Sequence, residues 1–306
     1  MSDFEHEALL YADQDEFLRG TVPFLEQGLR AGEPMLVAVG ADKIGTIVAA
    51  LHRDADKVQF ADMARLGANP ARIISAWHDF VSARGDDTPV RGIGEPIWAG
   101  RSAAELVECQ RHESLLNLAF ATTPAFRLLC PYDTRALPAA VIQEARCSHP
   151  RLVRGEDERP SDAFRGLDAI ARPFAAPMPE PPAEAECYGF DAERLPFLRE
   201  VVAAHATLAA LSPRRARDLA FAVNELTTNS VRHAGGRGVL RMWTDDGAVL
   251  CEVRDEGRLD APLAGRLRPT GESGGWGLWL ANEVCDLVQL RSYPAGSAVR
   301  LHMRRP

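Results

Sequence analysis

Residues 213–233 read PRRARDLAFAVNELTTNSVRH and predict one long amphipathic helix. Ser212 stands at the N-cap position, and Pro213 occupies the first helical turn, where a missing backbone N–H costs nothing. The positions expected to face a core recur with helical spacing at Ala216, Leu219, Val223, Leu226 and Ser230. Gly235 and Gly236 end the pattern. The stretch is therefore expected to pack one face against the rest of a folded domain.

Two polar side chains of this helix lie on a face that is offset from the apolar stripe. Glu225 and Asn229 are four residues apart, which places them on the same face, with Arg232 and His233 one turn further on. A carboxylate beside a carboxamide oxygen suits a hard cation and a proton acceptor. Taken alone, the pair is more often part of a solvated helix face.

Two further features follow in the chain. Asp255-Glu256-Gly257 ends the strand predicted at 249–254, where an acid followed by glycine is also a common turn. The run 274–280, GGWGLWL, opens a helix. Glycines there let the backbone approach a ligand, and a helix start can present N–H groups to a phosphate. No Lys-Ser/Thr follows the last glycine, so the run is not a P-loop.

The C-terminal part is expected to be a two-layer α/β sandwich. A stripe of residues predicts a first helix, at Leu195, Leu198, Val202, His205 and Ala209. A β-hairpin is predicted at 239–243 and 249–253, with its turn at Asp245-Asp246-Gly247. A helix at 277–284 follows, and a closing hairpin has Val288 and Leu290 on one arm and Val299, Leu301 and Met303 on the other. Helices on one face of such a sheet give two layers.

In this order and separation, the three polar features resemble the N, G1 and G2 boxes of the GHKL (Bergerat) ATPases, with similarity extending over about 190–304. The resemblance implies that ATP and Mg²⁺ are the cofactors. Asn229 would hold the Mg²⁺, Glu225 would act as the catalytic general base, and Asp255 would accept from the adenine amino group. The cofactor-binding residues implied in this way are Asn229, His233, Asp255, Gly257, Gly275, Gly277 and Leu278. Residues 258–273 would form a lid, and His233 is equally suited to be a helix C-terminal cation.

Within that superfamily, the chain looks like the bacterial anti-sigma factor/serine-protein kinases. Members of that branch bind a sigma factor and phosphorylate Ser or Thr of a small STAS-type antagonist, commonly as homodimers. A non-catalytic, nucleotide-dependent module that binds a sigma factor is the alternative, and a partner for a histidine kinase in trans is a third reading. Ala298 stands where the family pattern has a hydroxyl residue, which leaves Ser297 as the nearby hydroxyl.

A composition break separates this part from the first half. Residues 172–186, RPFAAPMPEPPAEAE, hold five prolines and predict an extended spacer. A spacer of this kind cannot form the dimerisation helix pair that precedes the ATPase domain of histidine kinases. The predicted organisation is a sensory domain at 5–158, a Pro-rich linker at 159–189 and the ATPase domain at 190–306.

The first half alternates strands and helices, which indicates a three-layer α/β domain with a largely parallel sheet. Strands are predicted at 34–39 and at 126–130, the second ended by Pro131, and helices at 71–83 and 102–120. Ser102 and Glu105 have capping-box spacing.

Four segments of this half resemble the MEDS (methanogen/methylotroph sensory) domains over about 5–155: HEALLY at 6–11, GEP at 32–34, RGIGEPIW at 91–98 and ECQRHE at 108–113. The resemblance implies an unidentified small organic ligand. Glu95-Pro96 forms a loop at a predicted strand end, where α/β proteins bind ligands. Glu105, Glu108 and His112 have a spacing that suits a metal, although His112 and Glu113 are more often ordinary surface groups.

Bulk properties set the remaining expectations. The net charge of -8 disfavours direct nucleic-acid binding. The six cysteines form no C-x-x-C pair and predict neither a zinc framework nor disulfides. The first residues lack signal-peptide character, and no apolar run approaches the ~18 residues needed to span a bilayer. A cytoplasmic protein with no membrane partner is therefore expected.

Overall fold

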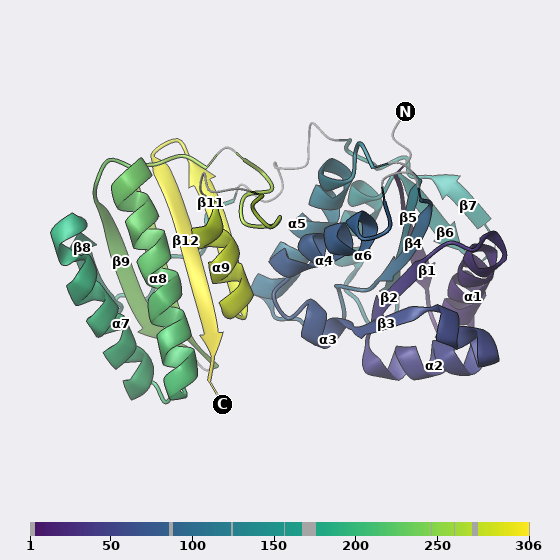
Figure 1. Ribbon diagram of the computed structural model, residues 1–306, viewed down its shortest axis with the longest axis horizontal. Helices are drawn as coiled ribbons and strands as arrows, with labels where there is room; N and C mark the ends of the chain where they lie inside the picture. Colours follow the sequence, from purple (N-terminus) through teal and green to yellow (C-terminus); the bar gives the residue numbers. More distant parts are fainter. Residues whose placement is uncertain are drawn as a thin grey trace. The chain divides into compact units, whose positions relative to one another are not determined.

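The computed structural model describes residues 4–85, 88–123, 125–155, 157–166, 176–245, 247–259, 261–270 and 275–305. The chain divides into two compact units, Met1–Arg172 and Pro173–Pro306, which are described separately (Figure 1). Among the described residues, no helix is both long and apolar enough to cross a bilayer.

The N-terminal unit is built around one seven-stranded sheet. Its elements are β1 (Glu5–Tyr11), α1 (Gln14–Ala31), β2 (Met35–Val39), α2 (Ala41–Leu51), η1 (His52–Lys57), β3 (Gln59–Asp62), α3 (Met63–Leu66), α4 (Ala71–Ser82), β4 (Val90–Gly94), α5 (Ala103–Ala119), β5 (Phe126–Asp133), α6 (Ala139–Ser148), β6 (Arg151–Arg154) and β7 (Asp157–Pro160). The strand order is β3-β2-β4-β5-β1-β6-β7. All neighbours are parallel except the antiparallel pair β6 and β7.

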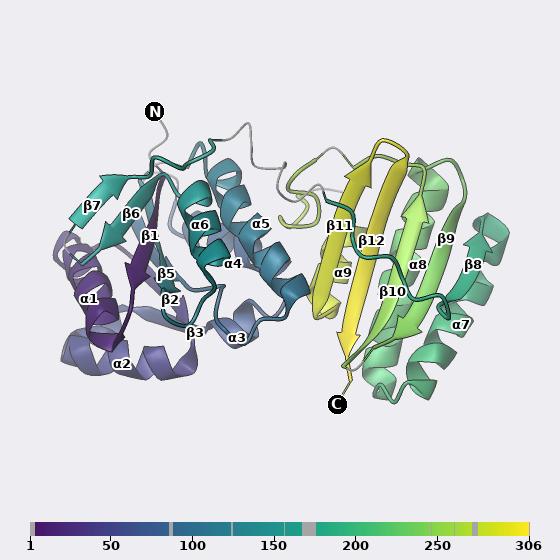
Figure 2. The same ribbon diagram turned by 180° about the vertical axis from the view of Figure 1, so that it is seen from behind.

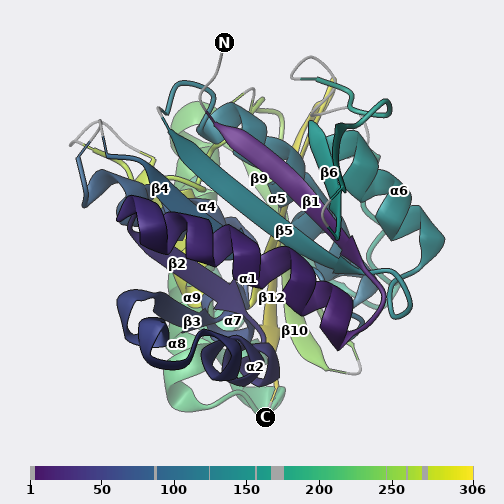
Figure 3. The same ribbon diagram turned by 90° about the vertical axis from the view of Figure 1, so that its right-hand side faces the viewer.

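Helices cover both faces of this sheet, which confirms the three-layer α/β prediction. α1 and α2 lie on one face, and α4, α5 and α6 lie on the other (Figure 3). The first face carries a buried apolar cluster in which Leu9 of β1 meets Phe17 of α1 and Ile47 of α2. The opposite face carries Trp77, whose ring lies so close to Gly92 that a Cβ atom there would be 2.7 Å from it. Strands buried on both faces explain the near-continuous apolar runs of the sequence.

The predicted helices of this unit are confirmed within a residue or two, and the capping box of Ser102 and Glu105 is present at the start of α5. The predicted end of the strand at Pro131 is wrong, because β5 continues to Asp133. β5 pairs with β4 only as far as Leu129, so at Pro131 the described residues pair β5 with β1 alone. A strand position with one partner tolerates the missing N–H of proline.

Within the described residues, the C-terminal unit has five antiparallel strands and three α-helices on one face of the sheet (Figures 1 and 2). Its elements are β8 (Glu186–Phe190), η4 (Ala192–Arg194), α7 (Leu195–Leu208), α8 (Pro213–His233), β9 (Gly238–Thr244), β10 (Ala248–Asp255), α9 (Trp276–Val284), β11 (Leu287–Tyr293) and β12 (Gly296–Arg304). The strand order is β11-β12-β10-β9-β8. The predicted two-layer sandwich is confirmed.

The core of this unit lies between the helices and the sheet. Leu219, Val223 and Leu226 of α8 join residues of α7, α9 and the strands in one buried cluster. Ser212 caps α8 by accepting a hydrogen bond from the Arg215 N–H at 3.4 Å. The central helix therefore has its apolar stripe fixed against the sheet, which orients the rest of its surface. Asp246, in the predicted hairpin turn, lies outside the described residues.

The part of the predicted linker from residue 176 onward belongs to this unit. Figure 2 shows it crossing the sheet face opposite the helices before it becomes β8, which pairs with β9. The Pro179 carbonyl accepts a hydrogen bond of 2.6 Å from Arg300 Nη2, and Glu180 forms ion pairs with Arg241 and Arg254. Carbonyl and carboxylate oxygens of this stretch thus bind arginine side chains on that face of the sheet. Residues 176–185 are called the strap below.

Candidate nucleotide site

Glu225 and Asn229 of the predicted N box lie beside Gly277 of the predicted G2 box. A Cβ atom at this position would lie 2.8 Å from Asn229 Nδ2 and 3.2 Å from Glu225 Oε2. Glu225 and Asn229 are half-buried on α8, and Gly277 is buried in the first turn of α9. Among the described residues, neither polar side chain has a hydrogen-bond or ion-pair partner. Two polar groups are thus available beside a backbone that only glycine leaves open.

In the predicted G1 box, hydrogen bonds hold the Asp255 carboxylate in place. Asp255 Oδ2 accepts a hydrogen bond of 2.5 Å from Ser230 Oγ, and Asp255 Oδ1 accepts from Ser297 Oγ at 2.9 Å and from the Gly257 N–H at 3.0 Å. These donors fix the carboxylate at the end of β10. A carboxylate has about four lone-pair positions, so capacity for a further donor remains.

The strand register explains why a hydroxyl at 297 serves here. Asp255 pairs with Ser297, whereas Arg254 pairs with the fully buried Ala298. Gly296, which the sequence analysis did not single out, has φ +138°, and a Cβ atom there would lie 2.0 Å from the Asp255 carbonyl oxygen. In the sequence, its position directly before Ser297 is the feature that could have identified Gly296 as part of the site.

The glycines at 257 and 275 also lie where side chains are excluded or strained. A Cβ atom at Gly257 would be 2.6 Å from Ala234 Cβ, at the end of α8. Gly275 caps α9 with φ +88°, in the left-handed region that favours glycine. Gly257 therefore allows close approach of the end of α8, and Gly275 allows the backbone conformation that starts α9.

Two predicted residues stand apart from this group. His233 is exposed in the last turn of α8 and has no partner among the described residues. Leu278 is buried in the core cluster, and its Cγ would lie 2.5 Å from a Cβ atom at Gly265. Contact of either residue with nucleotide stays a prediction.

The predicted lid is described only in part, because residues 260 and 271–274 lie outside the described residues. Its described portion contacts α9 directly. The Gly265 carbonyl accepts a hydrogen bond of 2.9 Å from Asn282 Nδ2. The guanidinium of Arg268 lies 6.0 Å from the ring centroid of Trp276 and 5.7 Å from that of Trp279. Arginine and aromatic rings thus fasten this segment to the helix that begins at the third box.

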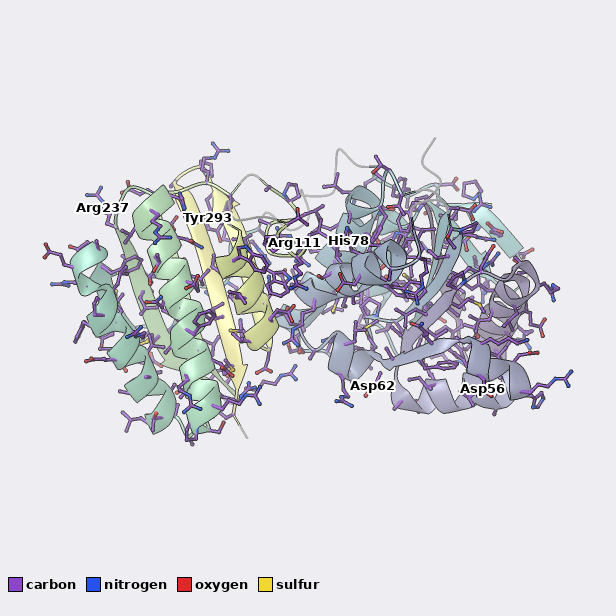
Figure 4. The ribbon with its side chains drawn as sticks, viewed as in Figure 1. Asp56, Asp62, His78, Arg111, Arg237 and Tyr293 are labelled. Atoms are coloured by element: carbon purple, nitrogen blue, oxygen red, sulfur yellow. The ribbon has the colours of Figure 1, made fainter. Side chains whose placement is uncertain are left out.

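An open cavity of about 690 Å³ borders the Asp255 end of the site. Its lining residues are Gly189, Phe190, Asp191, Arg194, Gly235, Gly236, Arg237, Gly238, Val239, Arg254, Asp255 and Glu256. Arg237, labelled in Figure 4, forms an ion pair of 3.1 Å with Glu256 at its rim. Glu225 and Asn229 do not line this cavity, so it adjoins the site at Asp255 and does not contain the α8 pair.

In the N-terminal unit, Glu95 follows β4 at the carboxyl edge of the sheet, as predicted. Its carboxylate accepts a hydrogen bond of 3.1 Å from the Tyr11 hydroxyl and forms an ion pair with Lys43. Burial raises the pKa of Glu95 despite the neighbouring ammonium group. Ligand binding at this edge stays a prediction.

The metal site considered for α5 does not form from the predicted triad. Glu105 serves the capping box and lies 3.7 Å from Arg101, and Glu108 lies 3.8 Å from Arg111. The prediction that His112 and Glu113 are surface groups is wrong, because both are 1% exposed. α5 lies beside α4 and α6, and polar residues on several of its sides are buried.

Glu113 instead joins a group drawn from other elements. His6, Glu113, Cys130 and His149, called the buried cluster below, offer ligand atoms that all lie within 4.8 Å of one another. Burial lowers the pKa of His6 to about 4.

Two family models match the chain, one within each compact unit. Residues 5–150 match the family model described as MEDS, the methanogen/methylotroph DcmR sensory domain. Residues 189–303 match the family model described as histidine kinase-like ATPase domain. The chain therefore joins a MEDS-type sensory domain to a histidine kinase-like ATPase domain. A search of the curated proteins gave no match.

Among solved structures, the chain is similar to the RsbU and RsbW domains of Rv1364c from Mycobacterium tuberculosis, with 17% sequence identity and a TM-score of 0.30. The similarity covers 41% of this chain and 34% of that chain, so the present chain spans about a third of its length.

Proposed function

We propose that the chain is a signalling ATPase of the anti-sigma type, which binds Mg-ATP and phosphorylates Ser or Thr of a STAS-type anti-sigma-antagonist protein. The observation that carries the proposal is the convergence of Glu225 and Asn229 on Gly277, with neither polar group engaged by another described residue. The family match over 189–303 supports nucleotide binding in the same region.

The residues around Gly277 and Asp255 fit Mg-ATP. Because position 277 is a glycine, a carboxylate and a carboxamide can lie directly against the backbone at the start of α9, where a Cβ atom would displace them. The carboxamide oxygen of Asn229 would hold the magnesium ion, and the carboxylate of Asp255 would accept from the adenine amino group. Bound Mg²⁺ supplies neutralisation of the phosphate charge.

The chain's own contribution to transfer is positioning and one proton acceptor. Phosphoryl transfer places most of its demands on geometry and charge neutralisation. Glu225 lies on a helix whose apolar face is packed in the core, so the helix directs its side chain toward Gly277. It is suited to take the proton from the attacking hydroxyl.

Control of this activity is assigned to the N-terminal domain, whose family match is to a sensory domain. We propose that a small organic molecule binds there and that the signal changes partner binding by the ATPase domain. A sigma factor and the antagonist are the proposed protein partners, and a homodimer is the proposed assembly.

Titration of the full chain with ATP and Mg²⁺ tests the nucleotide assignment. We expect Asn229→Ala to lose magnesium-dependent binding, while Asn224→Ala keeps it. Asn224 is a matched control because it is a half-buried carboxamide on the same helix that lines a different groove, with Phe221 and Arg199. Normal binding by the Asn229 variant would contradict the site.

A second variant distinguishes a kinase from a nucleotide-dependent binding module. With labelled ATP and candidate STAS-domain proteins, wild-type chain is expected to form an acid-stable phosphoester. Glu225→Gln should bind ATP but transfer no phosphate, whereas Glu200→Gln, an exposed change on α7, should behave as wild type. Unchanged sigma-factor regulation without any transfer by wild type would favour the module. Acid-labile phosphate would indicate histidine.

A further inference from the structure

The buried cluster gathers four potential ligands from four separate elements. His6 comes from β1, Glu113 from α5, Cys130 from β5, and His149 directly follows α6. Glu113 Oε2 lies 3.2 Å from His6 Nε2 and 3.0 Å from His149 Nε2, and Cys130 Sγ lies 3.4 Å from His6 Nε2. All four side chains are at most 1% exposed. Nitrogen, oxygen and sulfur atoms thus converge on one point inside the unit.

The hydrogen bonds of Asn117 fix the tautomer of His6. Asn117 Nδ2 faces three backbone carbonyls, those of Glu113, Ser114 and Ser148, at 2.8 to 3.4 Å. That arrangement turns Asn117 Oδ1 toward His6 Nδ1, 3.2 Å away. Because a carboxamide oxygen only accepts, His6 Nδ1 carries the proton. When the imidazole is neutral, its Nε2 then presents a lone pair toward the cluster.

His149 is oriented in the same way. Its Nδ1 lies 2.8 Å from the Ala145 carbonyl oxygen, which is an acceptor only, so Nδ1 donates. Its Nε2 lies 3.0 Å from the Glu113 carboxylate without hydrogen-bond geometry. Metal-binding histidines commonly have the second ring nitrogen held by a carbonyl or carboxamide oxygen in this manner.

With both imidazoles neutral, their Nε2 lone pairs face the Glu113 carboxylate, and the Cys130 thiol can supply only a weak donor, to His6 Nε2. Two imidazole Nε2 atoms and the Cys130 sulfur surround a carboxylate that is itself an acceptor when ionised. Burying such a set without a positive charge between its members is costly. We propose that the four residues bind one divalent transition-metal ion of the zinc type.

The spacing and the donor set both favour zinc. With zinc–nitrogen bonds of about 2.0–2.1 Å and zinc–sulfur bonds of about 2.3 Å, tetrahedral ligands lie about 3.3 to 3.6 Å apart. The contacts of 3.0, 3.2 and 3.4 Å are close to that range. Two imidazoles, a carboxylate and a thiolate suit zinc, whereas magnesium and calcium prefer oxygen ligands.

The immediate surroundings are those of a closed site. The ring of Tyr132 packs edge-on against His149, with centroids 5.5 Å apart, and its buried hydroxyl has no hydrogen-bond partner among the described residues. Four protein ligands without solvent access are typical of a structural zinc ion. The ion would join β1, β5, α5 and the end of α6.

Metal content of the full-length protein is the first test. We expect about one equivalent of zinc after expression in zinc-supplemented medium, or after refolding in the presence of Zn²⁺. Without nucleotide, refolding with Co²⁺ should give the visible bands of a tetrahedral ion and a thiolate-to-cobalt charge-transfer band. Folded wild-type protein that takes up neither metal would overturn the proposal.

Two cysteine variants locate the ligand. Cys130→Ser should lose the charge-transfer band, whereas Cys109→Ser should keep it. Cys109 is a buried thiol on α5 whose Sγ contacts the Pro96 carbonyl oxygen, so it matches burial without belonging to the cluster. Circular dichroism checks that both variants fold. A band that survives in folded Cys130→Ser would overturn the assignment.

A variant of the other domain separates this proposal from the nucleotide site. Asn229→Ala should retain the zinc and the cobalt spectrum in full. If that variant lost the metal, the ion would belong to the ATPase domain and the cluster would not be its site. Loss of ATP binding with normal metal content would instead leave the cluster assignment intact.

Discussion

The two domains differ in how deeply their polar residues are buried and in whether those residues have partners. The buried cluster of the N-terminal unit is almost inaccessible, and its members contact one another from four elements. In the C-terminal unit, Glu225 and Asn229 are half-buried and have no partner among the described residues. The first arrangement suits a group that holds a fold together. The second suits a group that meets a ligand, and it offers little stability in return.

The largest expected effect follows from removing Glu113. Glu113→Ala should lower the free energy of unfolding of the N-terminal unit by about 3–5 kcal/mol, because it removes one member of a buried polar cluster and leaves the others without their partner. Asn229→Ala should change that quantity in its own unit by no more than ~0.5 kcal/mol. Denaturant unfolding of both variants measures the contrast. Equal losses would mean that the α8 carboxamide is structural and the comparison fails.

A methyl group at Gly277 should affect binding far more than folding. In Gly277→Ala the added Cβ atom would displace Asn229 Nδ2 and Glu225 Oε2 from their positions, and displacement of this kind costs on the order of 100-fold. We expect such a loss in the affinity for Mg-ATP, measured by calorimetry, with a melting temperature near that of wild type.

Gly45→Ala provides the matched control for that change. Gly45 is an exposed position inside α2, and a Cβ atom there would meet nothing within 4 Å. The substitution should stabilise the N-terminal unit by about 0.5–1 kcal/mol through helix propensity and leave nucleotide binding unchanged. Wild-type affinity in Gly277→Ala would show that nucleotide binding does not depend on the positions of Asn229 and Glu225 beside Gly277.

The sequence predicted the parts of the site that depend on local signals. The N-cap Ser212, the stripe on α8 and the start of α9 near Gly277 are encoded by neighbours in the chain. The order of the three boxes then indicated that Glu225 and Asp255 belong to one domain. Local periodicity and capping are sufficient for these features because each element satisfies most of its own backbone groups.

The remaining parts depend on contacts between distant residues, which no local pattern reveals. His6 and Cys130 are 124 residues apart, and their meeting is set by the parallel register of β1 and β5. The pairing of Ser297 with Asp255 likewise follows from the register of β10 and β12. The strap at 176–185 was predicted as a spacer, because its prolines do not reveal that Glu180 meets two arginines.

A smaller effect is expected for the hydroxyl groups that hold Asp255. Ser297→Ala removes one of the three hydrogen bonds to this carboxylate and should cost about 0.5–1.5 kcal/mol, seen either in unfolding or as a loss of up to about tenfold in ATP affinity. Thr207→Ala, on the exposed side of α7, is the control. Ala298→Ser should not compensate, because position 298 pairs with Arg254. Full rescue by that second change would contradict the register.

The smallest expected effect concerns thiol reactivity, and it probes whether the buried cluster is closed. Cys187 is exposed, whereas the other five cysteines are buried. Cys109 and Cys130 are at most 1% exposed, so a reagent in solution has little access to either sulfur. A chromogenic disulfide reagent should therefore label one thiol rapidly in native wild type and none in Cys187→Ser.

The same measurement tests the comparison between the two domains. If Cys187→Ser still shows a fast thiol and peptide mapping assigns it to Cys130, the cluster opens to solvent on the timescale of labelling. The polar groups of the N-terminal unit would then resemble the accessible pair on α8, and a ligand-exchange role would replace the structural one. Labelling confined to Cys187 means that β1, β5 and α5 stay closed over Cys130, as their burial requires.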